Sequence, residues 1–286
     1  MLQNFRFGVS VGLPESRSVW IDKARVAEAL GFDVLLLPDH LSHLDPFTPL
    51  AVAAQVTEQL RVGTLVLIND FHNAALLVRQ VATVDLLTDG RLELGLGLGH
   101  RRWEYEAAGV AFGPLADRVK RLGATVALVR EKLWDRPHLR LLLGGASEGI
   151  LALAASEADI VGFAGLRQRR AGEPGTFDLE LPEATEKRVA HLRRLAGERM
   201  DDLELNALVQ VVEVTDDRQG AAERMVAERL PSWTPQQVLD SPFLMLGTPD
   251  DLARELLERK ERLGFSYYVV FEPAMEAFAK VIAKLR

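Results

Sequence analysis

The amino-acid sequence predicts an α/β protein folded as a (β/α)8 barrel, the TIM-barrel architecture. Three observations lead to this prediction. The chain has 286 residues, close to the roughly 250 typical of one such barrel. Eight short apolar segments alternate with helical segments, which is the pattern of parallel strands joined by helices. The apolar run at 34–37 ends directly in Pro38, Asp39 and His40, and ionisable residues at the C-terminal end of a strand are typical of barrel active sites.

The first half of the chain contains four predicted strands. An alternating, β-rich pattern indicates strand one at 5–11, and four consecutive apolar residues at 34–37 indicate a strand buried on both faces. Between them, residues 19–30 have one apolar helical face, and Gly31 ends that helix. The helix predicted at 46–60 has proline near its start, where the missing N–H costs nothing. The remaining elements of this half are a strand at 61–68, an amphipathic helix at 74–87 closed by Asp89-Gly90, and a strand at 91–96.

The same alternation continues through the second half. Helices are predicted at 118–134, 148–155, 185–197, 221–230, 249–263 and 275–285, and strands at 139–143, 159–163, 203–214 and 267–271. Residues 165–183 interrupt the rhythm with several glycines, prolines and arginines, and we expect an irregular insertion or lid loop there. No composition shift divides the chain, so we expect one domain over 1–286. A doubly wound open sheet is the alternative, but it normally needs fewer strands.

The composition excludes several classes of function. Hydrophobic residues make up 48% and charged residues 26%, as in a soluble globular protein, and the net charge of −7 argues against nucleic acid or an anionic membrane as a partner. There is no cysteine, which excludes disulfides, thiol catalysis and zinc–thiolate sites. The N-terminus lacks a signal-peptide core, and no apolar run is long enough to span a membrane. We therefore expect a cytoplasmic protein.

The clearest candidate for chemistry is the segment from Asp39 to Asp45. One interpretation is a catalytic His40 that carries a proton near neutral pH and is oriented by Asp39. A second is a metal site with His43 and Asp45 as further ligands, which would suit a metal-dependent hydrolase. A third is an ordinary polar loop with no chemistry. Strand one offers no histidine or aspartate, which weakens the metal interpretation.

Two glycine-rich segments follow other predicted strands. Gly97 and Gly99 would let a flat ligand approach the backbone, and His100 places a second ionisable group at the same rim; barrel packing is the alternative role for these glycines. Gly144-Gly145-Ala146 lead from a strand into a helix, where exposed N–H groups can bind a phosphate. An ordinary turn with Ser147 as helix cap is the alternative. Several arginines lie near the same predicted rim, where they could hold the anionic tail of a ligand or could be solvated surface residues. They are Arg101, Arg102, Arg167, Arg169 and Arg170.

These motifs together resemble the bacterial luciferase-like monooxygenase superfamily, most closely its coenzyme F420 (deazaflavin)-dependent oxidoreductases. The resemblance covers nearly the whole chain. The matching motifs are GFDV at 31–34, PDH at 38–40, LRVGTLVL at 60–67, VATVD at 81–85, GRLELGLG at 90–97, LGGA at 143–146, ADIV at 158–161 and LGTP at 246–249. This chain differs in having Pro38 before the Asp-His pair, His100-Arg101-Arg102 after Gly99, and a short segment at 135–140.

The resemblance implies roles for individual residues. Asp39 would bond the deazaflavin head group, and His40 would lie beside its reacting face. A cis peptide would fall at Leu65-Val66. The backbone N–H groups of Gly144, Gly145 and Ala146 would hold the cofactor phosphate. Gly97 and Gly99 would let the cofactor ring approach the backbone. The residues that the resemblance and the strand ends assign to the site are Asp39, His40, Leu65, Val66, Gly97, Gly99, His100, Gly144, Gly145 and Ala146.

The sequence therefore predicts an oxidoreductase that transfers hydride between F420 and a small organic substrate, with His40, together with His100, handling the proton. The first alternative is an FMN-dependent monooxygenase on the same barrel. A metal-dependent hydrolase and a non-catalytic cofactor-binding protein are the others. We expect a homodimer, because relatives associate through helices near the early strands.

Overall fold

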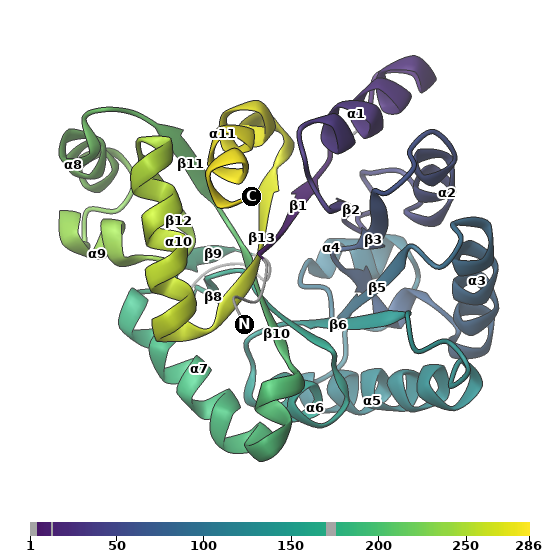
Figure 1. Ribbon diagram of the computed structural model, residues 1–286. Coiled ribbons are helices and arrows are strands. Elements are labelled where there is room, and N and C mark those ends of the chain that lie inside the picture. The colour runs from purple at the N-terminus through teal and green to yellow at the C-terminus, as the bar shows by residue number, and fades with distance from the viewer. Residues whose placement is uncertain (1–4, 13, 170–175) are drawn as a thin grey trace.

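The computed structural model describes residues 5–12, 14–169 and 176–286, and it contains the predicted closed barrel. Pairing of β3 with β5 and of β1 with β13 closes the ring. Figure 1 shows the helices outside the strands. Within the described residues, eight parallel strands form the barrel: β1 (Arg6–Ser10), β2 (Val34–Leu37), β3 (Arg61–Thr64), β5 (Leu92–Gly97), β6 (Arg140–Gly144), β7 (Ile160–Phe163), β10 (Glu204–Leu208) and β13 (Phe265–Phe271).

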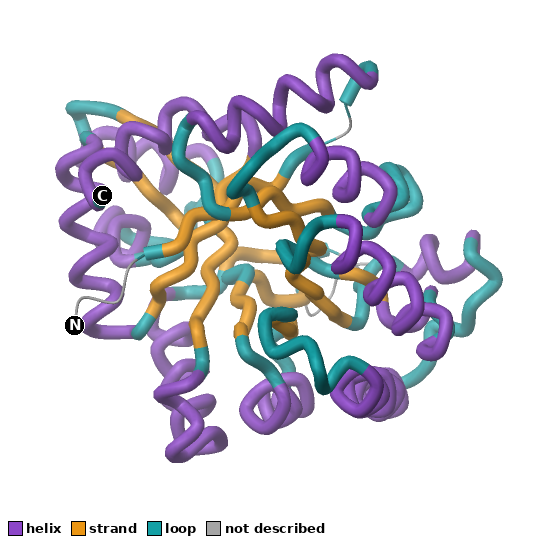
Figure 2. Tube along the Cα trace, turned by 45° about the vertical axis from the view of Figure 1, so that its right-hand side comes forward, coloured by secondary structure: helices purple, strands orange, loops and turns teal. Residues whose placement is uncertain are grey.

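The helices follow the strands along the chain and cover the outside of the barrel (Figure 2). The predicted helices at 74–87, 249–263 and 275–285 have the same bounds in the structure. None of the helices in the described part of the chain is long and apolar enough to cross a membrane. The helices are α1 (Arg17–Ala29), α2 (Phe47–Gln55), α3 (Ala74–Leu87), α4 (Arg102–Ala107), α5 (Leu115–Lys132), α6 (Glu148–Glu157), α7 (Pro182–Ala196), α8 (Arg218–Glu228), α9 (Pro235–Asp240), α10 (Pro249–Leu263) and α11 (Met275–Leu285).

Strand β2 shows why a continuous apolar run marks a barrel strand. Val34 and Leu36 belong to the apolar cluster inside the barrel, whereas Leu35 and Leu37 belong to the larger cluster between strands and helices. All four residues are buried, because successive side chains point to opposite faces and both faces are covered. Each leucine buried in this way contributes roughly 1.5–3 kcal/mol to folding.

A network of charged side chains fills the barrel at the N-terminal ends of its strands. Arg6 pairs with both Glu93 and Glu204, and its Nη1 lies 2.7 Å from Glu204 Oε2. Arg61 Nε lies 2.8 Å from Glu93 Oε1, and Arg140 Nη1 lies 2.7 Å from Glu204 Oε2. Each carboxylate therefore has two guanidinium partners, which offsets the cost of burying its charge.

The predicted strand at 203–214 is wrong in one respect, because it consists of two strands in different sheets. β10 belongs to the barrel, whereas β11 (Val211–Val214) pairs with β12 (Leu244–Gly247) in a separate parallel sheet. Gln210 lies at the break: its N–H donates to the Phe243 carbonyl, and its side-chain amide donates to the Ala164 and Leu208 carbonyls. The apolar pattern of residues 203–214 continues through this change of partner strand, so the sequence gives no sign of it. Strand β12 was not predicted.

Several other predicted bounds also differ from the structure, and three segments show this clearly. The helix predicted at 46–60 ends at Gln55, because the Glu28 carboxylate accepts the N–H groups of residues 58–60. The strand predicted at 61–68 is divided into β3 and β4 (Leu67–Ile68). In the predicted insertion at 165–183, β8 (Leu166–Gln168) and β9 (Phe177–Leu179) form an antiparallel hairpin and α7 begins at Pro182, while residues 170–175 lie outside the described residues.

Candidate active site

The predicted site residues lie at or just after the C-terminal ends of four barrel strands, and Leu65 directly follows β3. His40 lies three residues after β2, His100 lies three residues after β5, and Gly144 ends β6. Because all the barrel strands are parallel, these ends open onto the same rim. This is the rim at which (β/α)8 barrels assemble their active sites.

His40 is held by a carboxylate that the sequence analysis missed. Its Nδ1 lies 3.0 and 3.2 Å from the two carboxylate oxygens of Glu104, and the Leu41 N–H donates to Glu104 Oε1 at 3.3 Å. Glu104 is completely buried, at 0% exposure. A buried carboxylate beside Nδ1 selects the tautomer in which Nδ1 carries a proton, and it stabilises the imidazolium that forms when Nε2 accepts another.

Short contacts around α4 keep Glu104 in position. The Tyr105 hydroxyl, adjacent in sequence, donates to the Leu98 carbonyl at the end of β5. The Arg118 guanidinium of α5 donates to the Leu98 carbonyl as well, and to the Gly99 carbonyl at 2.8 Å. Burial raises the pKa of the Tyr105 phenol to about 12, so it remains a donor at neutral pH. The turn after β5 is thereby fixed to two helices.

Four rings form a row across the rim. The His43 and His40 centroids are 5.5 Å apart, and the His40 and His100 rings meet edge to face at 5.6 Å. The His100 ring in turn meets Phe177 of the β8–β9 hairpin at 4.9 Å. Burial lowers the pKa of His100 to about 4, with smaller effects from the charges of His40, Arg101 and Arg118. His100 is therefore neutral at physiological pH and changes its protonation state only in acid.

Asp39 contacts protein groups through one oxygen. Its Oδ2 accepts the Ile68 N–H at 2.9 Å and lies 3.0 Å from Nε2 of His72, a residue that the sequence analysis did not select. The peptide bond between Leu65 and Val66, just before β4, is cis, as the resemblance implied. Asp39 thus connects the end of β2 to the segment that contains this bond.

The glycines near Val66 make room for its side chain. A Cβ built on Gly97 would lie 2.6 Å from Val66 Cγ2, and one on Gly144 would lie 3.1 Å from Val66 Cγ1. Gly99 has a φ of +65°, and a Cβ there would lie 2.8 Å from Ile68. Leu65 and Val66 are half-buried and pack on the cluster inside the barrel. In this structure the glycines accommodate protein side chains directly, and the apolar pair at 65–66 lies at the open end of the barrel.

The turn from β6 into α6 has its own set of contacts. Gly145 has a φ of +148°, its N–H donates to the Gly162 carbonyl at 3.3 Å, and Ser147 caps α6. The Ala146 carbonyl accepts from Arg188 of α7. Of the three N–H groups that were expected to meet a phosphate, the one of Gly145 therefore already has a protein acceptor. Sequence alone could not identify Arg188, because it lies 42 residues from Ala146.

A family model described as luciferase-like monooxygenase matches residues 4–241. The chain belongs to the luciferase-like monooxygenase family.

Members of this family differ in activity, and the similarities are partial. The chain is 32% identical over 128 residues to an F420-dependent glucose-6-phosphate dehydrogenase of Amycolatopsis mediterranei, a match that covers 42% of this chain and 38% of the relative. The chain thus spans about two fifths of the length of the curated relatives it matches. The fold also matches solved structures. They include an F420-dependent tetrahydromethanopterin reductase of Methanopyrus kandleri (15% identity, 99% and 100% covered, TM-score 0.74) and a long-chain alkane monooxygenase (15% identity, 100% and 92% covered, TM-score 0.75).

Other candidates from the sequence have local structural roles in this member of the luciferase-like family. Asp45 caps α2 by accepting the Thr48 N–H at 3.0 Å and its hydroxyl at 2.7 Å. Residues 5–12, 14–169 and 176–286 contain no group of three histidine or acidic side chains that could hold a metal ion. Of the arginines, Arg169 pairs with Asp178, Arg102 stacks on Phe112, and Arg170 lies outside the described residues.

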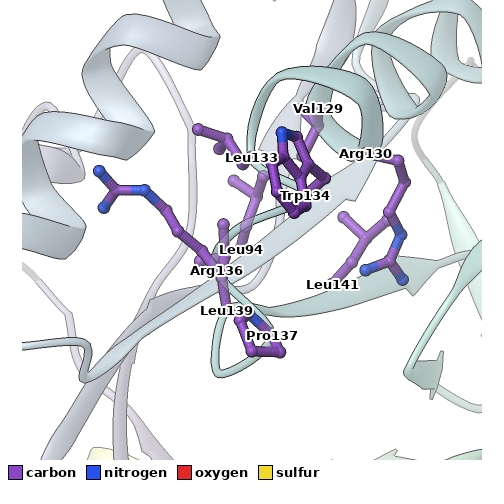
Figure 3. A pocket seen from close by; sticks show the side chains of 9 residues that line it. All are labelled: Leu94, Val129, Arg130, Leu133, Trp134, Arg136, Pro137, Leu139 and Leu141. Atoms are coloured by element: carbon purple, nitrogen blue, oxygen red, sulfur yellow. The ribbon is translucent and has the colours of Figure 1, made fainter.

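The lining of a cavity of about 170 Å³ includes none of the candidate site residues (Figure 3). Its apolar walls come from α5, β5 and β6, and Trp134 and Pro137 belong to the loop that leads into β6. Loops of this kind, from helix to strand, lie at the N-terminal ends of the strands, where barrels carry stability rather than chemistry. The rim around His40, not this cavity, is therefore the candidate active site.

Proposed function

We propose that this protein is an oxidoreductase that uses the deazaflavin F420 to exchange hydride with a small organic substrate. The observation that carries the proposal is the pair formed by His40 and the buried Glu104 at the C-terminal rim of a luciferase-like barrel. The F420-dependent enzymes among the relatives support the choice of cofactor. When bound, a deazaflavin supplies the hydride donor or acceptor.

The chain's own residues supply proton transfer and orientation. With Nδ1 directed at Glu104, the Nε2 atom of His40 is the atom that takes a proton from a substrate hydroxyl, or returns one in the reverse direction. Glu104 stabilises the charged imidazole. His100, neutral because burial lowers its pKa, forms an uncharged wall that helps to exclude water.

The rim has surfaces that fit a planar cofactor with a phosphate. Leu65 and Val66 present half-buried apolar side chains beside the residues that follow β2, which suits the face of a ring system. Gly144 and Ala146, in the turn from β6 into α6, would meet the phosphate, with Arg188 bonded to the Ala146 carbonyl. Asp39 would help to position the cofactor ring indirectly, by holding the segment that contains Leu65 and Val66 through the Ile68 N–H.

A binding titration tests the choice of cofactor. We expect the apoprotein to bind F420 more tightly than FMN, as followed by the change in cofactor fluorescence. A strong preference for FMN would favour the second candidate, an FMN-dependent monooxygenase, which the family's alkane monooxygenase neighbour supports at the level of the fold. Binding of neither cofactor would contradict both candidates.

We also propose a cytoplasmic homodimer, with the contact on the early helices. Val26 of α1, Val52 of α2 and Leu76 and Leu86 of α3 are large apolar residues with 36–70% of their surface exposed. Burying such residues against a second copy would remove apolar surface from water. Light scattering after size exclusion should give twice the monomer mass, and Leu76→Glu should reduce it to the monomer mass. A monomeric wild-type protein would refute the proposal.

A further inference from the structure

The β8–β9 hairpin reaches the candidate active site through one aromatic side chain. Phe177, the first residue of β9, meets the His100 ring edge to face at 4.9 Å, and His100 meets His40 in the same way at 5.6 Å. Figure 1 shows β8 and β9 side by side; they pair antiparallel, with Leu166 opposite Leu179 and Gln168 opposite Phe177. A two-stranded hairpin of this length is unstable alone, so its position depends on contacts at its base.

Those contacts come from α7 and lead back to the glycine turn. Glu180, one residue after β9, is buried, and its N–H donates to the Gly165 carbonyl at 2.7 Å. Arg188 Nε donates to the Glu180 carboxylate at 2.5 Å, and Arg188 Nη1 donates to the Ala146 carbonyl. One guanidinium thus joins the exit of the hairpin to the turn between β6 and α6.

We propose that Arg188 and Phe177 are positioning residues: Arg188 fixes β9 to the glycine turn, and Phe177 thereby holds the His100 ring against His40. This assignment rests on the proposed function for its catalytic meaning, because the turn at 144–146 is where the cofactor phosphate would lie. The contacts of Arg188 with Glu180 and with the Ala146 carbonyl need no bound ligand. Without Arg188, the buried Glu180 carboxylate would lose the cation that offsets its desolvation, and the base of the hairpin would have to move toward water.

The protonation of His100 in the apoprotein reports the position of the hairpin. Burial is the main reason for its low pKa of about 4, and the charged groups that face it are His40, Arg101 and Arg118. None of these belongs to the hairpin or to α7. Moving Phe177 away would uncover the ring while leaving those charges in place, so the pKa would rise toward the ordinary value of 6.5.

The test is an NMR titration of the histidine ring protons in the full-length apoprotein, with His100→Asn used to assign the resonance. We expect Arg188→Met and Phe177→Ala each to raise the pKa of His100 by about one unit or more. The double variant should behave like Phe177→Ala alone, because both changes act through the same side chain. The matched control is Arg193→Met on the same helix, where the guanidinium also donates to a carbonyl, that of Leu263, at 3.0 Å.

Two results would overturn the proposal. One is an unchanged pKa of His100 in Phe177→Ala. This variant should fold even if Arg188→Met does not, because Phe177 is only half-buried. The other is an equal rise of the His100 pKa in Arg193→Met, which would mean that loss of any arginine contact of α7 exposes the ring. A separate titration with F420 should show weaker binding in Arg188→Met than in the wild type. Failure of the wild type to bind F420 would contradict the proposed function and leave the NMR result standing.

Discussion

Replacing Glu104 by glutamine tests the central pair of the site. The substitution removes the charge that faces His40 Nδ1 at 3.0 and 3.2 Å and keeps nearly the same shape. Glu104 is completely buried, so water does not screen its charge or replace it. A hydrogen bond to a charged group contributes about 1.5–3 kcal/mol, which corresponds to roughly a 10- to 150-fold loss of turnover if the charge acts in the transition state.

The assay is steady-state turnover of an organic substrate that the wild type converts, followed by the absorbance of the deazaflavin. F420 binding should change less than threefold, since Glu104 contacts His40 and Leu41 rather than the apolar pair at 65–66. The matched control is Glu106→Gln, an exposed residue of the same helix. Wild-type turnover in Glu104→Gln would refute the idea that this carboxylate acts through His40.

Three further predictions concern single residues. His40→Ala should lower turnover by about 10²-fold or more with cofactor binding retained, and an unchanged rate would exclude it as the proton carrier. Burial lowers the pKa of His100 from its ordinary value of 6.5 to about 4 in the folded state. The unfolded chain therefore binds more protons between these two values, and stability falls as the pH drops from 6.5 to 4. The loss should be about 1–2 kcal/mol, allowing for solvent screening, and His100→Asn should remove it in urea unfolding measured against pH. Gly97→Ala should destabilise the protein by about 1–3 kcal/mol, because the new methyl group would collide with Val66. Gly123→Ala, inside α5 with its nearest neighbour at 3.7 Å, should instead stabilise the protein by about 0.5–1 kcal/mol. Denaturant titration of both variants checks these opposite signs.

The fold could be predicted from sequence because its signals are local. The run Val34–Leu37 is apolar at every position because both of its faces are covered, and α10 begins with the Thr248 cap and ends at Gly264 in the left-handed conformation. The strand break at Gln210 left no such signal. The hydrogen bond from the Gln210 side chain to the Ala164 carbonyl cannot be inferred from sequence, because the two residues become neighbours only in the folded chain.

The candidate site was predictable only in part, for the same reason. His40 and the Leu65-Val66 cis peptide were found because they belong to recognisable motifs. Glu104 lies 64 residues from His40 on a helix of six residues, too short to show a periodic pattern. A glycine such as Gly97 is visible in a sequence, but the side chain that occupies its space is not.

The pairing of β1 with β13 has a consequence for biosynthesis. Arg6 to Ser10 align with Tyr267 to Phe271, so β1 leaves the ribosome long before the strand with which it pairs. At 5–20 residues per second, that delay is roughly 15–50 seconds, during which β1 offers an unpaired edge to any other nascent chain. Until β13 is made, this edge of β1 is therefore a site at which another chain can pair and start aggregation.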